Sequence, residues 1–306
     1  MNRPYPDILR TLLYYDIWQH PLTAEELFAF LPVNSMTFPE FQQVLSSVPK
    51  DAGIKHHKGY YFVAGKTESV VHHRLEKEKR ARQLWRMARL SAGLIRRFPF
   101  VRGVCVSGDL SKNVATGSSD VDFFIITEPN RLWITRTALI LFKKTFLLNS
   151  RKFFCINYLA SANHLAFDER NLFTATEIAT LKPMYGHALF QQYLEANSWI
   201  KEFFPNLGST VSPGANTGER QSMIQRVLES FFRAFDAEAL DIRLMNMMRN
   251  HWAKAYPEYD DATRERIFKC TRTESRAYIG NFQERILALY EHSLKEFNVD
   301  PEKGRH

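Results

Sequence analysis

Two aspartates at the start of an apolar segment are the residues best suited to chemistry. Asp120 and Asp122 stand on either side of Val121 and lead into segment 121–127, VDFFIIT. In a strand, residues i and i+2 point to the same face, so both carboxylates are expected to project together. Mg²⁺ prefers hard oxygen ligands and is usually held by one or two carboxylates together with substrate phosphates. The pair therefore predicts a divalent-metal site.

A glycine turn precedes this pair. The apolar segment 101–107, VRGVCVS, ends in Ser107-Gly108, and residues 109–119 then lead to Asp120. A glycine at such a turn lets backbone N–H groups approach a phosphate. The combination of a glycine turn and two acids predicts a phosphate-binding loop beside the metal.

The order of an apolar strand, Ser-Gly, a loop and Asp-x-Asp resembles the nucleotidyltransferase superfamily, which includes polymerase-β-like and kanamycin nucleotidyltransferases. The resemblance is carried by VSGD at 106–109 and SDVDF at 119–123, and it covers about residues 98–160. It implies a site with Mg²⁺, with two metals as in polymerase-type members, bound to Asp120 and Asp122. It also implies transfer of a nucleoside monophosphate from a nucleoside triphosphate to an acceptor that the sequence does not identify.

Two positions depart from that family's pattern. Asp109 stands where the family usually has Ser or Gly, and Asn157 stands where members commonly have a third carboxylate. An amide carries no charge and cannot act as a base, so Asn157 is a candidate catalytic position with altered chemistry. Two alternatives stay open: a transferase that works with two acids, or a catalytically degenerate module that binds a nucleotide or a nucleic acid.

Residues around the turn are candidates for contacts with the nucleotide. Gly108 and its neighbours are expected to hold the β- and γ-phosphates, and Lys112 and Arg136 carry charge that neutralises phosphate. A single cation of this kind is more often a solvated surface residue. The complete set of nucleotide-binding candidates is Ser107, Gly108, Asp109, Lys112, Ser119 and Arg136.

Strands and helices of ordinary length are expected to position these residues. Apolar runs predict three strands, and amphipathic spacing predicts helices on either side of them. The predicted strands are 101–107, 121–127 and 152–160, and the predicted helices are 68–97, 130–148, most of 174–204, 223–256 and 277–297.

The first 67 residues predict a separate helical unit closed by a hairpin. Capping boxes at 23–26 and 37–40 open its second and third helices, and 54–64 reads as two short strands. This order resembles a winged-helix module, so a winged-helix DNA-binding regulator is a further alternative. The expected third helix carries no Lys or Arg, which favours packing or dimerisation over groove recognition and is compatible with a homo-oligomer.

Positive charge is concentrated in one stretch. The chain carries a net charge of +8, and residues 72–97 hold nine Lys and Arg against two Glu, which leaves +7 there. A helix of this charge predicts a polyanionic partner such as nucleic acid, although basic helices are often only solvated faces.

Composition places the chain among cytoplasmic globular proteins. It has 306 residues, of which 45% are hydrophobic and 24% charged, with no apolar run of membrane-spanning length and no secretory signal. Three cysteines without paired spacing predict neither a disulfide framework nor a zinc site. We therefore expect an α+β protein with no membrane partner. Its expected parts are a winged-helix-like unit (1–67), a small mixed-sheet core with the basic helix (68–204), a linker (205–221) and C-terminal helices (222–306).

Overall fold

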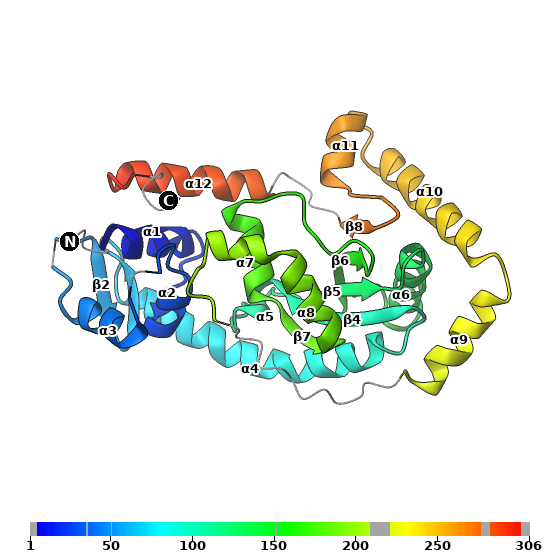
Figure 1. Ribbon diagram of the computed structural model, residues 1–306, viewed down its shortest axis with the longest axis horizontal. Coiled ribbons are helices and arrows are strands. Elements are labelled where there is room, and N and C mark those ends of the chain that lie inside the picture. Colours follow the sequence, from blue (N-terminus) through cyan, green and yellow to red (C-terminus); the bar gives the residue numbers. More distant parts are fainter. Residues whose placement is uncertain are drawn as a thin grey trace.

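The structure is a computed structural model with an α+β fold, as expected, and it contains one small and one larger sheet (Figure 1). It describes residues 5–34, 36–49, 51–150, 152–208, 221–276 and 282–300. The predicted linker falls mostly on residues 209–220, and the start of the last predicted helix falls on 277–281. Both of these segments lie outside the described residues.

The larger sheet holds the three predicted strands side by side. Its order is β7-β4-β5-β6-β8; β5 and β6 run parallel, and the other neighbours are antiparallel. The prediction that the three strands share one sheet is confirmed, with β6 beginning three residues later than expected. The strands are β4 (Val101–Ser107), β5 (Asp122–Thr127), β6 (Cys155–Ser161), β7 (Lys182–Tyr185) and β8 (Glu274–Arg276).

Two of these strands were not expected. The stretch 174–204 was predicted to be mostly helical, but β7 lies between α7 (Leu172–Thr180) and α8 (His187–Ala196), and the 3-10 helix η1 (Ser198–Glu202) follows. Pro183 cannot continue a helix, and in the structure it pairs with β4 at the sheet edge. β8 has only three residues and forms by pairing with β6, more than a hundred residues away.

Helices cover both faces of the sheet. The predicted helix 223–256 is in fact two helices, separated where Asp236 accepts a hydrogen bond from the backbone N–H of Ala239 and caps the second one. The helices of this region are α4 (Ser69–Ile95), α5 (Gly108–Ser111), α6 (Leu132–Phe146), α9 (Met223–Arg233), α10 (Ala237–Ala255) and α11 (Asp261–Ile267).

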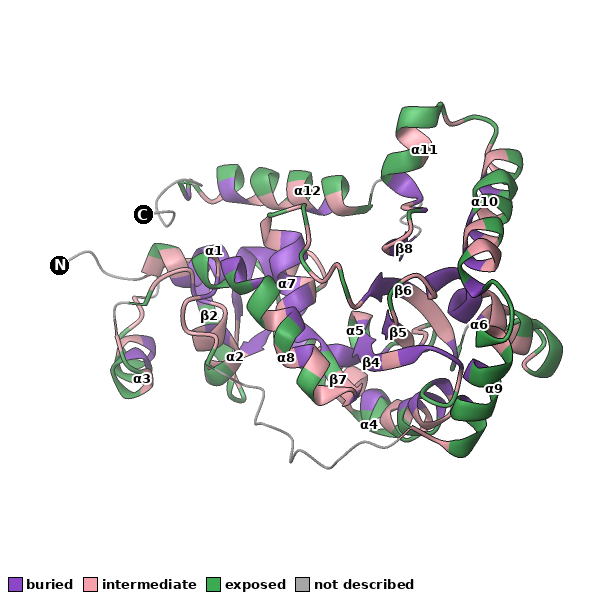
Figure 2. Cartoon of the chain, turned by 45° about the vertical axis from the view of Figure 1, so that its right-hand side comes forward, coloured by how far each residue is buried: buried purple, intermediate pink, exposed green. Residues whose placement is uncertain are grey.

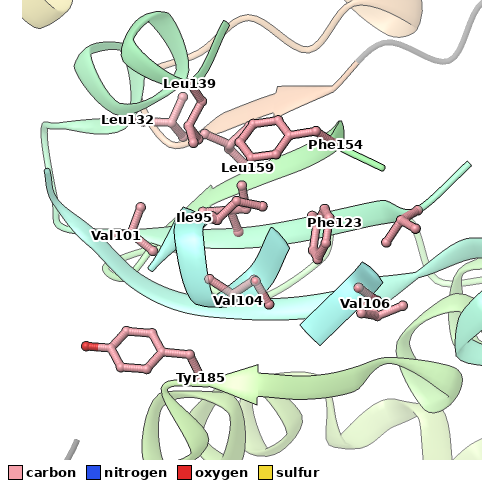
Figure 3. Close-up of a cluster of buried hydrophobic side chains, with 14 of the residues drawn as sticks. Ile95, Val101, Val104, Val106, Phe123, Leu132, Leu139, Phe154, Leu159 and Tyr185 are labelled. Carbon is pink, nitrogen blue, oxygen red and sulfur yellow. The ribbon is translucent and has the colours of Figure 1, made fainter. Parts of the chain in front are cut away.

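The two faces of the sheet have separate apolar cores. Side chains that alternate along the central strand divide between them, because successive residues of a strand point to opposite faces. Phe123 and Ile125 pack with residues of α4, α6 and α10, a cluster drawn in Figure 3. Phe124 and Ile126 pack on the other face, with residues of α7, α8 and η1. Figure 2 shows the central strands buried between these layers.

The N-terminal unit has the expected three helices and hairpin, with one additional strand. Both capping boxes form, and the short β1 pairs with β3 to give an antiparallel sheet of order β1-β3-β2. The elements are α1 (Tyr5–Asp16), β1 (Leu22–Thr23), α2 (Ala24–Ala29), α3 (Phe38–Ser46), β2 (Ile54–His57) and β3 (Tyr60–Val63).

The C-terminal region contributes to both cores. α12 (Phe282–Glu296) lies beside α1 in Figure 1, and its Ile286 and Leu294 belong to the apolar cluster of the N-terminal unit. On the other side, a carboxylate oxygen of Asp241 in α10 accepts hydrogen bonds from the backbone N–H groups of Trp133 (2.8 Å) and Ile134 (2.9 Å) at the start of α6. In the described part of the chain, none of the helices is long and apolar enough to cross a membrane.

Candidate functional site

The glycine turn and the second aspartate are in direct contact. Ser107, the last residue of β4, is paired across the sheet with Asp122, the first residue of β5. Gly108 follows with a φ of +64°, and a Cβ placed on it would lie 2.5 Å from Asp122 Oδ2. Only glycine satisfies both the left-handed backbone and this close approach. The predicted closeness of Asp122 and Gly108 is therefore confirmed.

Carboxylates gather around Asp122. Burial raises the pKa of Asp122 above its ordinary value, a hydrogen bond from Cys155 lowers it, and the charges of Asp120, Asp109 and Glu177 raise it further. The charged groups that act on Asp122 are thus all negative. A bound cation would relieve this repulsion, because an opposite charge within a few ångströms favours the ionised form.

Cys155 is a neighbour of the site that the sequence did not single out. It lies opposite Asp122 in the parallel pairing of β5 and β6. Burial and the adjacent Asp122 carboxylate raise the pKa of the Cys155 thiol to about 12. The thiol is therefore neutral at physiological pH and donates its hydrogen to the carboxylate.

Asn157 occupies an irregular position in β6. Phe123 pairs with Ile156 and Phe124 pairs with Tyr158, so Asn157 is an extra residue without a partner on β5. A β-bulge of this kind redirects a side chain and is common beside active sites. Asn157 accordingly lines the same cavity as Ser107 and Glu177.

That cavity lies between the sheet and α7 and has a volume of about 40 Å³. The Ser107 hydroxyl on its wall is 93% buried (7% exposed) and has no hydrogen-bond partner. A buried hydroxyl without a partner costs free energy unless a ligand or water satisfies it. Whole ligand pockets usually measure several hundred Å³, so a nucleotide would lie across the rim of the cavity, not inside it. Aromatic rings form much of the remaining wall: Phe124, Tyr158, Phe167, Phe173 and Tyr193.

The loop between β4 and β5 is tied together by polar contacts. The Ser119 hydroxyl donates to Asp109 Oδ2 at 2.7 Å and accepts from the Thr116 backbone N–H at 2.8 Å. Lys112 Nζ donates to Glu177 Oε1 at 2.8 Å and approaches the Gly108 carbonyl at 3.3 Å. The structure therefore brings the nucleotide-binding candidates of the loop together at Gly108, and it adds Glu177 of α7, which the sequence did not indicate.

Arg136 is the exception among the expected site residues. It lies on α6, which covers the opposite face of the sheet from Glu177 and the cavity. Its guanidinium is buried 5.7 Å from the ring centre of Trp252, and burial lowers its pKa to about 10. The expectation that Arg136 faces the phosphates is not met, because Arg136 lies on the side of α6 that packs against α10.

The donor chemistry of the site fits a hard cation. Asp122 provides carboxylate oxygens beside the charge of Asp120, and the Ser107 hydroxyl, which has no hydrogen-bond partner, is a donor for a phosphate oxygen. Among the residues that the structure describes, no group of three or more His, Cys, Asp or Glu side chains is arranged to hold a metal by itself. Mg²⁺ does not require one, since it keeps several waters and substrate oxygens.

Comparison with known proteins gives no further indication. No protein-family model, no curated protein and no solved structure matches this chain.

Proposed function

We propose that the protein transfers a nucleoside monophosphate from a nucleoside triphosphate to an acceptor, with Mg²⁺ bound by Asp120 and Asp122. The observation that carries the proposal is the contact between Gly108 and Asp122 within a group of carboxylates. Because the glycine turn touches Asp122, a metal held by that carboxylate and a phosphate held at the turn would belong to one nucleoside triphosphate. The order of β4, the turn, β5 and β6 supports the resemblance to nucleotidyltransferases.

The chain's own residues have distinct roles in this reaction. Asp120 and Asp122 bind and orient the metal, and the Ser107 hydroxyl donates to a phosphate oxygen at the rim of the cavity. Lys112 neutralises phosphate charge from the side of the loop. Mg²⁺ supplies charge neutralisation at the α-phosphate and lowers the pKa of the attacking hydroxyl.

A cytoplasmic location is part of the same proposal. Cys105, Cys155 and Cys270 are all free thiols in the structure, as is usual in reducing compartments.

The double substitution Asp120→Asn with Asp122→Asn tests the assignment. We expect it to abolish Mg²⁺-dependent binding of a non-hydrolysable ATP analogue in calorimetry, while the circular dichroism spectrum stays unchanged. The matched control is Glu258→Gln with Glu265→Gln, which changes the net charge equally at two exposed residues, one between α10 and α11 and one on α11. Equal affinities for wild type and the aspartate variant would remove both residues from the site.

A second candidate function is binding of the nucleotide without transfer. Asn157 favours it, because an uncharged amide, which cannot act as a base, lines the same cavity as Ser107 in place of a third acid. Release of pyrophosphate from a nucleoside triphosphate, measured with a pooled cell extract as acceptor, separates this candidate from the first.

We propose a polyanion, such as nucleic acid, as a partner of α4. Arg74 is buried and forms ion pairs with Glu26 and Glu78, so it is not available to a partner. Other cations of the helix are exposed, at helical spacing along one side, and have no ion pair among the described residues. They are Lys79, Arg82, Arg86 and Arg89. A stripe of unpaired cations suits a phosphate backbone, which releases counterions when it is neutralised.

A further inference from the structure

The helix α9 is attached to the sheet through polar side chains. Gln225 and Glu229 lie one turn apart on its inner face, and both are buried. The Gln225 amide donates a hydrogen bond to the backbone carbonyl of Val101 at 2.9 Å. Glu229 accepts one from the backbone N–H of Phe100 at 2.8 Å, and the Arg102 guanidinium donates to both of its carboxylate oxygens, at 2.8 and 3.0 Å.

The outer face of α9 is apolar and lies open, as Figure 2 shows by the exposed residues along this helix. Residues four apart lie on the same side of a helix, and apolar side chains recur here at that spacing. They form a stripe that ends at Phe235, two residues past the helix, whose ring centre lies 5.2 Å from that of Phe231. The members of the stripe are 38–73% exposed: Met223, Ile224, Val227, Leu228, Phe231 and Phe235.

This orientation is the reverse of the usual one. An amphipathic helix on a protein surface normally turns its apolar side to the core and its polar side to water. The stripe of α9 cannot turn inward, because that would take the buried Glu229 carboxylate away from its partners, and breaking a buried ion pair is strongly destabilising. An apolar patch held outward in this way indicates a site of association.

The size of the stripe suits a protein partner. Six large apolar side chains, each roughly half exposed or more, present on the order of 500 Å² of surface. The smaller stable interfaces between proteins bury about 600 Å² on each partner. The stripe therefore supplies most of one partner's share of such an interface.

The charges beside the stripe favour a protein over a lipid surface. Helices that lie on membranes carry many Lys and Arg residues next to their apolar side. Arg233 of α9 is instead held by carboxylates of this chain, 3.1 Å from Glu128 and 3.6 Å from Glu229. Its charge is therefore already balanced.

The two ends of the stripe carry opposite charges, which suits a second copy of the chain. Arg226 is exposed in the first turn of α9, and Asp236 is exposed just after the last turn. A two-fold axis through the middle of the stripe runs two copies of α9 in opposite directions. It brings Arg226 of one copy toward Asp236 of the other, and it sets Val227 of one copy beside Phe231 of the other.

We infer that the apolar stripe of α9 is the interface of a homodimer, in which the two copies of the helix pack antiparallel. Residues four apart form ridges, and ridges of this kind interlock when two helices cross. The interface lies at the start of β4, since α9 is attached at Val101, and the candidate site lies at the other end of that strand, at Ser107. Both copies of the site stay open in the dimer, and the inference does not depend on the reaction there.

Sedimentation equilibrium of the full chain at a series of concentrations tests the inference. We expect the wild type to form a dimer. Phe231→Gln should raise the dissociation constant at least about a hundredfold, because loss of a central apolar anchor costs about tenfold or more and occurs in both copies. The matched control is Phe146→Gln, since Phe146 on α6 is 70% exposed and Phe231 is 60% exposed. The control should change the constant by less than about threefold, as expected for a surface substitution.

A second variant keeps the inference testable if Phe231→Gln disturbs α9 itself, because the Phe231 ring also contacts Phe232 and Phe235. Val227→Gln changes an exposed aliphatic residue of the same stripe and should weaken the dimer in the same direction. Oxidative cross-linking tests the antiparallel arrangement. A mixture of the variants Val227→Cys and Phe231→Cys should join to each other faster than either joins to itself, and faster joining of like with like would overturn that arrangement.

Three outcomes would overturn the homodimer at α9. The first is a wild type that stays monomeric at about 100 µM. The second is a dimer that both Phe231→Gln and Val227→Gln leave as tight as Phe146→Gln does, which would place the interface elsewhere. The third is a monomer that binds vesicles of phosphatidylcholine and phosphatidylglycerol and loses this binding in Phe231→Gln, which would assign the stripe to a lipid surface.

Discussion

Replacing Gly108 by alanine tests how closely the glycine turn and the metal site depend on each other. The backbone φ of +64° costs a residue with a Cβ roughly 1–2 kcal/mol of folding free energy. The new methyl carbon would also lie 2.5 Å from Asp122 Oδ2, which is too close for a carbon and an oxygen that are not covalently bonded. The carboxylate has to rotate away, since it is the mobile end of a side chain.

Displacing this carboxylate should affect the metal more than the fold. A disturbed ligand set typically loses about 10–100-fold in metal affinity, which corresponds to about 1.4–2.7 kcal/mol of binding free energy. We therefore expect Gly108→Ala to lower Mn²⁺ affinity by that factor, measured by electron paramagnetic resonance with a non-hydrolysable ATP analogue present. Unfolding by urea should show only the smaller backbone cost of roughly 1–2 kcal/mol.

Gly65→Ala provides the matched control. Gly65 has a φ of +96°, and a Cβ placed on it would meet nothing within 4 Å. Its substitution should destabilise the protein at least as much as Gly108→Ala and leave Mn²⁺ affinity unchanged. Equal Mn²⁺ affinity in Gly108→Ala and wild type would refute the reasoning, because it would show that the turn and Asp122 do not share a ligand.

Two further predictions concern charge elsewhere in the chain. His20 is held neutral, because burial and the charges of Arg74, Lys112 and Lys77 lower its pKa well below 6.5. As the pH falls below about 6.5, only the unfolded chain gains this proton, so the free energy of unfolding should decrease by about 1.4 kcal/mol per pH unit. In urea denaturation between about pH 6.5 and 5, His20→Gln should flatten this decrease. If the exposed stripe of α4 contacts phosphates, binding of duplex DNA or RNA to the full chain should weaken as salt is added. The slope of log binding constant against log salt concentration should then be smaller in magnitude by about 2–3 in the triple variant Arg82→Gln, Arg86→Gln and Arg89→Gln. No binding at low salt would exclude this partner.

The sequence by itself determined the local parts of the site. Asp120 and Asp122 fall at a strand start because an apolar run follows them, and glycine follows Ser107 because the turn needs a left-handed backbone. Capping at Thr23 and Thr37 was equally predictable, since a capping box involves residues only three apart. Signals of this kind act within one turn or one strand, so they can be recognised without knowing what packs against them.

Tertiary structure alone decided which side chains meet across elements. The Lys112–Glu177 pair joins residues 65 positions apart, and no periodicity within α7 marks Glu177 as different from a solvated acid. Arg136 shows the converse: its charge suggested a phosphate, but packing of α6 against α10 places it under Trp252. β8 forms because β6 offers it a free edge. Local sequence sets the shape of each element, whereas the face each one buries depends on contacts between segments distant along the chain.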